Sequence, residues 1–206
     1  MIGVIDYRIG NVNSVVNMLK KIGVLSRIVN SAEEIEKVDK LIIPGVGSFD
    51  AGIKKLRESG LVEPILKHAV REKKPILGIC LGMQMLGRKS DEGEELGLSL
   101  IPFDSVKFKF NKVDGANKIP HMGWNYVDIC LKEDKLVKGL ANDPRFYFVH
   151  SYHALCDSDE NILMKCKYGY EFPAAVKKGN IYGLQFHPEK SHKYGMVILK
   201  NFTEIS

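Results

Sequence analysis

The sequence lacks the features that mark membrane proteins, nucleic-acid-binding proteins and metalloproteins. It has no apolar run near 18 residues and no basic segment at its start, so we expect a cytoplasmic protein that contacts no membrane. The mild net charge of +5 comes without a run of five like charges or an aromatic-basic stripe, which argues against a nucleic-acid partner. The four cysteines, at positions 80, 130, 156 and 166, form no C-x-x-C pair and have no histidine at zinc-finger spacing. We therefore expect reduced thiols and no metal site.

What is present is typical of a globular enzyme. The chain has 206 residues, of which 45% are hydrophobic and 27% are charged, and it shows no internal repeat or low-complexity linker. This length suits one large domain, so we expect a single domain over 1–206 with one active site.

The first half of the chain alternates short apolar runs with stretches of helical spacing. Apolar runs at 2–6, 25–29, 40–43 and 75–79 are separated by helical patterns at 12–22, after Ser31, at 53–56 and at 61–69. Ser31 begins an S-x-x-E capping box, and Gly23 is a natural helix stop. Such alternation predicts an α/β fold with a mostly parallel sheet flanked by helices.

The second half has a different pattern. Strand-like segments at 105–110, 124–129, 146–151, 162–166, 174–177 and 181–186 follow one another with few helical patterns between them, and a last helix is expected at 191–202. We expect antiparallel strands that extend the parallel sheet into one mixed sheet.

The strongest chemical signal is Gly78-Ile79-Cys80-Leu81-Gly82, which lies between the fourth strand and a helix expected at 83–86. This pattern has the form of a nucleophile elbow with cysteine in place of serine. The N-terminus of the following helix would favour the thiolate. The alternative is a buried cysteine on a glycine-rich turn.

A base and an orienting acid are found in Gln185-Phe186-His187-Pro188-Glu189. Residues i and i+2 of an extended segment project to one side, and Pro188 keeps His187 out of a helix. Taken alone, the segment could be a solvated turn. Together with the elbow it favours a triad of Cys80, His187 and Glu189 for nucleophilic catalysis.

A glycine-rich turn, Gly45-Val46-Gly47, follows the third strand. It lacks the third glycine of a dinucleotide-binding motif and the Gly-Lys-Ser/Thr end of a P-loop, so we expect no nucleotide cofactor and no cofactor of another kind. A backbone N–H aimed at an oxyanion is the interpretation we favour, and a phosphate loop or a plain turn are the alternatives.

At these residues the sequence resembles the triad-type, or class I, glutamine amidotransferases, and more narrowly the family of glutaminase subunits of imidazole glycerol phosphate synthase. The resemblance covers nearly the whole chain. Its motifs are Asp6-Tyr7 through Gly10-Asn11, Pro44 through Phe49, Gly78 through Gln84, Pro120 through Asn125, His150-Ser151-Tyr152, and His187 through Ser191.

The resemblance implies a flavodoxin-like core and a reaction in which Cys80 attacks the side-chain amide of L-glutamine. His187 would pass the proton to departing ammonia, and water would release glutamate from a thioester. The positions matched to the family are the oxyanion-hole N–H groups of Gly47 and Leu81 and the glutamine-binding residues Gln84, Glu92, Ser151 and Tyr152.

The resemblance also implies a heterodimer with a (β/α)8-barrel synthase subunit, to which ammonia is channelled and which activates the glutaminase. Positions matched to that interface are Asn11, Pro120, Met122, Trp124, Tyr147 and Lys190. The site elements span Gly45 to Glu189, which leaves no length for a domain that would use the ammonia. We therefore expect the product to serve a partner that makes imidazole glycerol phosphate and AICAR in histidine biosynthesis.

One position departs from the family pattern. The usual Asp-Tyr-Gly is Asp6-Tyr7-Arg8 here, which places a cation near the expected interface. A related glutaminase that feeds a sugar amidotransferase in surface-polysaccharide synthesis is therefore an alternative. Two further alternatives are a catalytically silent regulatory subunit and a stand-alone hydrolase of γ-glutamyl compounds that uses the same cysteine.

Overall fold

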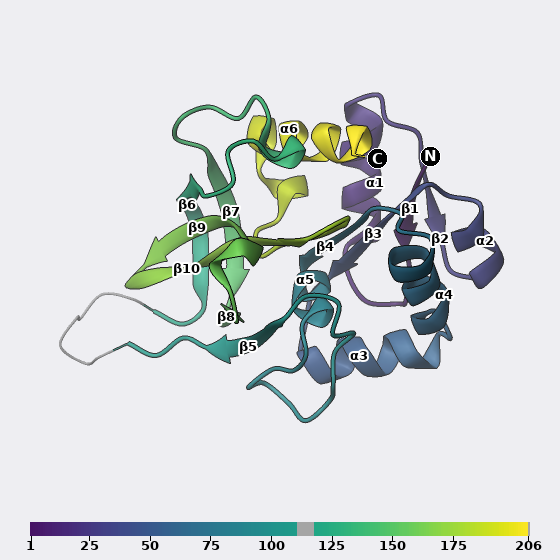
Figure 1. The fold of residues 1–206 in the computed structure, drawn as a ribbon, viewed down its shortest axis with the longest axis horizontal. Coiled ribbons are helices and arrows are strands. Elements are labelled where there is room, and N and C mark those ends of the chain that lie inside the picture. The colour runs from purple at the N-terminus through teal and green to yellow at the C-terminus, as the bar shows by residue number, and fades with distance from the viewer. Residues whose placement is uncertain (111–117, 206) are drawn as a thin grey trace.

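A parallel sheet forms the centre of the computed structural model, which describes residues 1–110 and 118–205 (Figure 1). Its first four strands are β1 (Ile2–Ile5), β2 (Ser26–Val29), β3 (Lys40–Gly45) and β4 (Ile76–Cys80). They lie in the order β2-β1-β3-β4, and β11 (Ile181–Leu184) continues the parallel set beside β4. This order is that of the flavodoxin-like doubly wound fold, so the predicted parallel core is confirmed.

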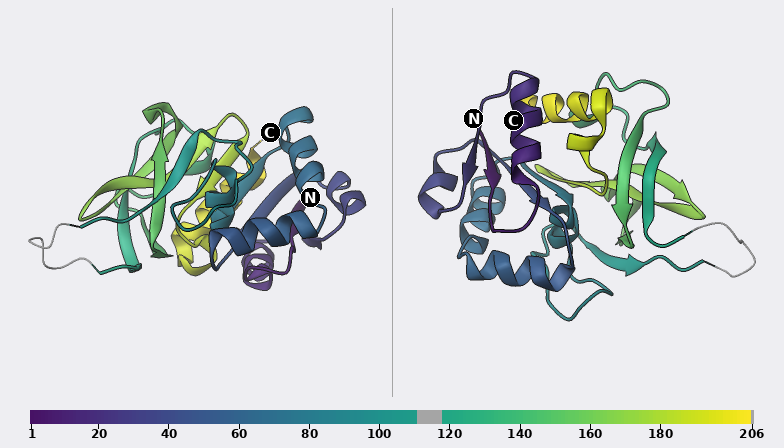
Figure 2. Two further views of the ribbon diagram at one scale, coloured as in Figure 1. Left: turned by 90° about the horizontal axis from the view of Figure 1, so that it is seen from below. Right: turned by 180° about the vertical axis from the view of Figure 1, so that it is seen from behind.

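Helices cover both faces of this sheet, and each face has its own hydrophobic core. One face carries α1 (Val12–Lys21) and α6 (His192–Glu204), which lie side by side in Figure 2. The other carries α2 (Ala32–Glu36), α3 (Phe49–Glu58), α4 (Val62–Leu66) with a π-helical continuation over Lys67–Arg71, and α5 (Leu81–Leu86). Both cores are aliphatic where they meet the sheet, since β1 and β4 are buried throughout.

Local signals set several helix ends as expected. The Ser31 side chain accepts a hydrogen bond from Glu34 N at 3.3 Å, so the predicted cap of α2 is present. The predicted stop after α1 is also present, since Gly23 has a φ of +74° and its N–H donates to the Lys20 carbonyl. Within the described part of the chain, no helix has the length and apolarity needed to cross a membrane.

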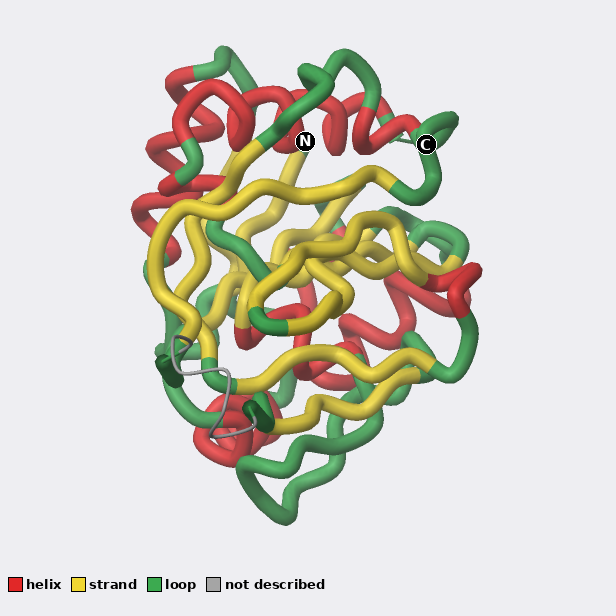
Figure 3. The backbone as a smooth tube through the Cα atoms, turned by 90° about the vertical axis from the view of Figure 1, so that its left-hand side faces the viewer, coloured by secondary structure: helices red, strands yellow, loops and turns green. Residues whose placement is uncertain are grey.

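The second half adds antiparallel strands to the same sheet, which face the viewer in Figure 3. Beyond β11 the order is β10 (Tyr170–Lys178), β9 (Ile162–Tyr168), β6 (His121–Ile129) and β7 (Arg145–His150). β6 changes partner along its length: its first six residues pair with β7 and its last three with β9. Short 3₁₀ turns at Lys135–Val137, Asp159–Asn161 and Pro188–Lys190 connect these elements.

Two details of the expected sheet were wrong. The segment at 181–186 was expected to be antiparallel, but β11 runs parallel to β4 because the hairpin from β10 inserts it between β10 and β4. The segment at 105–110 does not extend the main sheet. It forms β5 (Phe103–Lys107), which pairs with the unpredicted strand β8 (Tyr152–Cys156) in a separate two-stranded sheet.

Candidate active site

The predicted nucleophile elbow is present at the carboxyl end of β4. Cys80 has a φ of 53° and a ψ of −109°, a strained conformation for a residue with a side chain, and α5 begins at the next residue. The flanking glycines are required sterically. A Cβ at residue 78 would lie 2.6 Å from the Gly82 carbonyl oxygen, and a Cβ at residue 82 would overlap the Ile43 carbonyl oxygen. The turn therefore fixes Cys80 by backbone contacts on both sides.

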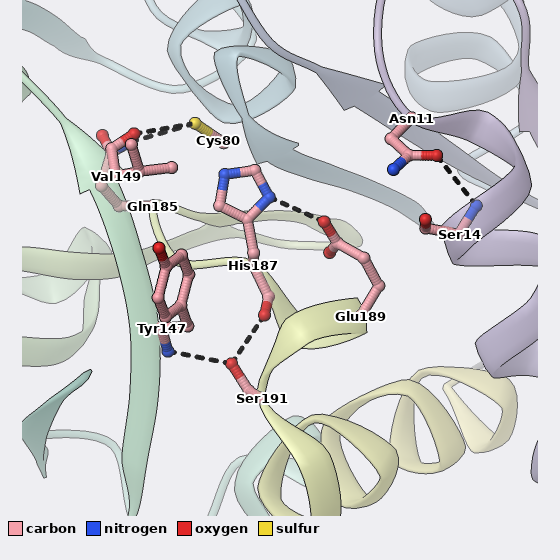
Figure 4. A network of polar contacts seen from close by, with 9 residues as sticks. All are labelled: Asn11, Ser14, Cys80, Tyr147, Val149, Gln185, His187, Glu189 and Ser191. Carbon is pink, nitrogen blue, oxygen red and sulfur yellow. Dashed lines mark hydrogen bonds and ion pairs between the residues drawn. The ribbon is translucent and has the colours of Figure 1, made fainter. Parts of the chain in front are cut away.

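The expected base lies beside the cysteine, just after β11 (Figure 4). His187 Nδ1 is 2.7 Å from Glu189 Oε1, as the i, i+2 spacing predicts. The His187 backbone is held on both sides, since its N–H donates to the Tyr147 carbonyl at 2.9 Å and its carbonyl accepts from Ser191 Oγ at 2.6 Å. The imidazole is therefore oriented by its carboxylate partner, and its backbone is held by β7 and by the residue that precedes α6.

The other ring nitrogen of His187 is directed toward the sulfur. Nε2 is buried without a hydrogen-bond partner among the described residues, and the ring lies between Cys80 and Glu189 in Figure 4. Burial by itself lowers the pKa of His187, but the interactions with Cys80 and Glu189 outweigh it and raise the pKa to about 9. A protonated imidazole in this place stabilises negative charge on Sγ and holds a proton for a leaving group.

A cavity of about 300 Å³ opens onto the cysteine. Its walls bring together Cys80, His187 and all six residues predicted for the oxyanion hole and for glutamine binding: Gly47, Leu81, Gln84, Glu92, Ser151 and Tyr152. These residues come from five separate stretches of the chain. The volume fits a small-molecule substrate.

The individual walls of the cavity are fixed by further contacts. Glu92 Oε2 accepts a hydrogen bond from Phe49 N at 2.7 Å, so its loop is attached to the N-terminus of α3. Tyr7 Oη donates to the Pro44 carbonyl at 2.9 Å, which secures the end of β3 just before Gly47. Leu81 N is the first N–H of α5, a position that no intrahelical carbonyl satisfies. The cavity can therefore present an anion to an ammonium group and backbone donors to an oxyanion.

The residues expected at a partner interface are mostly on the surface beside the triad. Met122 is 62% exposed and Trp124 is 42% exposed on the outer face of β6. Tyr147 pairs with Trp124 across the β6–β7 ladder, and Lys190 Nζ lies 5.7 Å from the centre of the Tyr147 ring. These four residues form one continuous surface.

Of the remaining two expected interface residues, Pro120 lines a second hollow together with Met122, whereas Asn11 lies at the start of α1. Asn11 caps α1 by accepting a hydrogen bond from Ser14 N at 3.2 Å, and α1 contacts the turn that carries Glu189. Pro120 lines the cavity itself.

Some residues at the site were not predicted, among them Gln185 and Val149. Gln185 is fully buried, its Nε2 lies 3.9 Å from Cys80 Sγ, and its Oε1 accepts from Gln84 Nε2 at 3.2 Å. The signal was available, since the i, i+2 argument that joins His187 to Glu189 extends back to Gln185. The Val149 carbonyl, 3.9 Å from Sγ, could not be foreseen because it depends on the position of β7.

Comparisons with known proteins agree with this geometry. The family model for glutamine amidotransferase class-I matches residues 3–205. The chain is 50% identical over 205 residues, 100% of both chains, to imidazole glycerol phosphate synthase subunit HisH 2 of Pseudomonas aeruginosa. It is 54% identical over 202 residues, 98% of both chains, to the protein of the same name from Methanococcus maripaludis.

Solved structures share the fold at much lower identity. The structure of PurLQS from Thermotoga maritima matches with a TM-score of 0.77 and 19% identity, over 98% of this chain and 97% of the other. The glutaminase domain of Trypanosoma brucei CTPS, solved with bound acivicin, matches with a TM-score of 0.65 and 15% identity, over 100% and 94% of the two chains. With the family match over nearly its whole length, the chain belongs to the class-I glutamine amidotransferases.

Proposed function

We infer that this chain is the glutaminase subunit of an imidazole glycerol phosphate synthase. It hydrolyses L-glutamine to glutamate and ammonia, and the ammonia is used in the cytoplasm to make imidazole glycerol phosphate and AICAR for histidine biosynthesis. The observation that carries this inference is the alignment of Cys80, His187 and Glu189 at one cavity. The relatives that match this chain over their full length, or nearly so, are named as subunits of that enzyme. Those names favour histidine biosynthesis over the sugar amidotransferase pathway.

The first half of the proposed reaction is acyl transfer to the cysteine. Sγ attacks the carboxamide carbon of glutamine, and the negative charge that moves to oxygen is stabilised by the N–H groups of Gly47 and Leu81. The tetrahedral intermediate collapses when His187 gives its Nε2 proton to the nitrogen, so the C–N bond breaks and ammonia leaves. A γ-glutamyl thioester on Cys80 remains.

The second half returns the enzyme to its starting state. His187, now neutral, takes a proton from water, and the hydroxide attacks the thioester carbon. The C–S bond then breaks, glutamate leaves, and the thiolate faces an imidazolium again. Glu189 keeps the Nδ1–H of His187 in place throughout.

We assign substrate recognition to the remaining walls of the cavity. Glu92 is the anion available to the α-ammonium group of glutamine, and its hydrogen bond from Phe49 N holds it at the cavity. Gln84, Ser151 and Tyr152 supply polar groups for the carboxylate and the amide.

We assign the exposed surface of Met122, Trp124, Tyr147 and Lys190, together with Asn11 and Pro120, to a (β/α)8-barrel synthase subunit. Large exposed aromatic and thioether side chains beside an active site suit a protein interface. The turn from Gly45 to Gly47 is the element through which docking would complete the oxyanion hole. A silent regulatory subunit and a stand-alone γ-glutamyl hydrolase are the other outcomes of the experiments below.

The activity is tested by ammonia release from glutamine. Cys80→Ala should lose about 10⁴-fold or more in kcat, whereas Cys166→Ala, which removes a buried thiol away from the cavity, should retain activity. Equal rates in Cys80→Ala and wild type would leave only a regulatory role.

The partner is tested by purifying the native protein with whatever it binds. A barrel subunit of the histidine enzyme is expected to co-purify and to raise glutaminase activity when its own ligand is added. Recovery of a sugar amidotransferase would assign the other pathway, and full activity of the isolated chain would indicate a stand-alone hydrolase.

A further inference from the structure

A buried pair of histidines lies at the glutamine-binding wall: His150 lines the cavity, and His121 lies behind it. His150 Nδ1 is 2.7 Å from the Tyr152 carbonyl oxygen, and His150 Nε2 is 2.9 Å from His121 Nδ1. Asn125 Nδ2 is 3.3 Å from His121 Nε2. These side chains therefore form a continuous series of hydrogen bonds from β6 to the cavity.

The direction of every hydrogen bond in this series follows from the two groups at its ends, the Tyr152 carbonyl and the Asn125 amide. The Tyr152 carbonyl can only accept, so His150 Nδ1 carries the proton and Nε2 of the neutral ring must accept from His121 Nδ1. The amide nitrogen of Asn125 donates to His121 Nε2, which is the one acceptor left on that ring. Burial lowers the pKa of His150 to about 3 and that of His121 to about 4, so both rings are neutral as this pattern requires.

The chain of hydrogen bonds continues from the wall to the nucleophile. The Tyr152 carbonyl also accepts from Gln84 Nε2 at 3.4 Å, and the same amide donates to Gln185 Oε1. Gln185 Nε2 in turn lies 3.9 Å from Cys80 Sγ. The Tyr152 carbonyl oxygen thus accepts hydrogen bonds from His150 and from Gln84, and Gln84 is bonded to the Gln185 side chain beside the sulfur.

Packing leaves the two histidines little freedom. The His121 ring is stacked between Tyr168, at 4.0 Å, and Phe148, at 4.7 Å, and is only 3% exposed. His150 is 5% exposed and its ring lies 5.2 Å from Phe108. Because both side chains are buried, a donor or acceptor left without its partner there would destabilise the wall.

We propose that His150 and His121 are positioning residues, which hold the Tyr152 backbone of the glutamine-binding wall in register with β6. His121 pairs directly with His150 across the β6–β7 ladder, while the alternate residues Met122 and Trp124 project from β6 to the outer surface. The wall that binds glutamine and the surface assigned to the partner are thereby fixed to one strand. This proposal rests on the proposed function, because it assigns Tyr152 to glutamine binding.

The test compares three buried histidines of one aromatic cluster. His150→Leu removes both hydrogen bonds of the His150 ring. His150→Asn keeps a donor near the position of Nδ1 for the Tyr152 carbonyl. His121→Leu leaves that bond in place and removes the next hydrogen bond, between His121 and His150. His153→Leu is the matched control: His153 is 5% exposed and packs 4.7 Å from Phe108, but its ring bonds Ala154 and Tyr170 and does not line the cavity.

The readout is kcat and KM for glutamine in the complex that the native chain forms, together with the midpoint of thermal unfolding. We expect His150→Leu to raise KM about tenfold with a smaller change in kcat, because the Tyr152 carbonyl loses one buried hydrogen bond. His121→Leu should raise KM about threefold, and His150→Asn should restore KM to within about threefold of wild type. His153→Leu should lower the unfolding midpoint without raising KM.

An unchanged KM in folded His150→Leu or His121→Leu would overturn the proposal, and so would an equal rise in His153→Leu. If His150→Leu fails to fold, His121→Leu and His150→Asn decide the question. Calorimetric binding of glutamine to the same variants in a Cys80→Ala background requires neither turnover nor a partner. Its result therefore separates a failure of this proposal from a failure of the proposed function.

Discussion

The two halves of the chain position the residues proposed for catalysis by different means. In the parallel half, up to α5, backbone sterics place Cys80: glycines stand where no Cβ fits, and the cysteine itself is strained. In the antiparallel half, side-chain hydrogen bonds place His187 and the cavity wall. Among the described residues, two of the twelve buried polar side chains lie before residue 87, and the other ten follow it.

The two halves therefore tolerate different kinds of substitution. A backbone turn without spare volume fails as soon as an atom is added, whereas a hydrogen-bonded wall can be adjusted by substituting one donor for another. The nucleophile is therefore fixed rigidly and the substrate wall is tunable.

Gly82→Ala should be the most damaging change in the parallel half. Its methyl group would overlap the Ile43 carbonyl oxygen, so we expect a loss of more than about 4 kcal/mol in the free energy of unfolding, measured by urea titration. Gly23→Ala is the control, because Gly23 also resists a side chain through its φ of +74° but has no atom within 4 Å. It should cost about 1 kcal/mol. Similar losses in the two variants would contradict the steric account.

Glu189→Gln should weaken the hydrogen-bonded half without unfolding it. Loss of the carboxylate lowers the pKa of His187 from about 9, and kcat should fall about 10²-fold because the imidazole is less well oriented. Titration of the imidazole by NMR and assays of ammonia release measure the two effects. The exposed Glu160→Gln should change neither.

The raised pKa of His187 also makes the free energy of unfolding depend on pH. Since the folded pKa of about 9 exceeds the ordinary value near 6.5, the stability contributed by the imidazolium is complete below pH ~6.5. It is lost as the pH rises through about 9. In Glu189→Gln the loss should begin at lower pH, which urea unfolding of both proteins between pH 6 and 9.5 would reveal.

Arg8→Gly should stabilise the parallel half. Arg8 holds a φ of +67°, which costs a residue with a Cβ about 1 kcal/mol, and glycine would remove that cost. Differential scanning calorimetry should show a higher unfolding temperature with unchanged glutaminase activity. Lys37→Gly, at an exposed residue with a φ of −86°, should instead lower it. A destabilised Arg8→Gly would mean that the side chain contributes more than its strained backbone costs.

Arg88→Met tests the connection between the halves. Its guanidinium bonds Asp157 through two 2.7 Å contacts and Asp104 through a third, which joins the loop after α5 to the β5–β8 ribbon. Since these groups are partly exposed, we expect a loss of about 1 kcal/mol that shrinks in high salt. Arg71→Met, which loses only a 3.9 Å pair with Glu63, should have no measurable effect.

Local sequence patterns predicted the parts of the molecule that depend on neighbouring residues. The elbow at Cys80, the His187–Glu189 pair and the Ser31 cap each depend on sterics or hydrogen bonds within a few positions. Family resemblance then identified Glu92 and Tyr152 as cavity residues, which spacing alone could not do.

The parts that were missed depend on contacts between distant segments. β8 was overlooked because Ser151 alone separates it from β7, so the apolar pattern gives no turn signal. The direction of β11 is set by a hairpin that inserts it beside β4. The His121–His150 contact exists only because β6 and β7 pair in that register.

The position of β11 beside β4 has a consequence for synthesis on the ribosome. β4 ends at residue 80 but its neighbour begins at residue 181, so β4 stays an unpaired, wholly apolar edge while about 100 more residues are added. At about 5–20 residues per second, that delay is on the order of 5–20 s. His187 and Glu189 arrive on the same late segment that covers this edge. Closure of the sheet and assembly of the triad are therefore one event, and a truncated chain carries a cysteine that has no base.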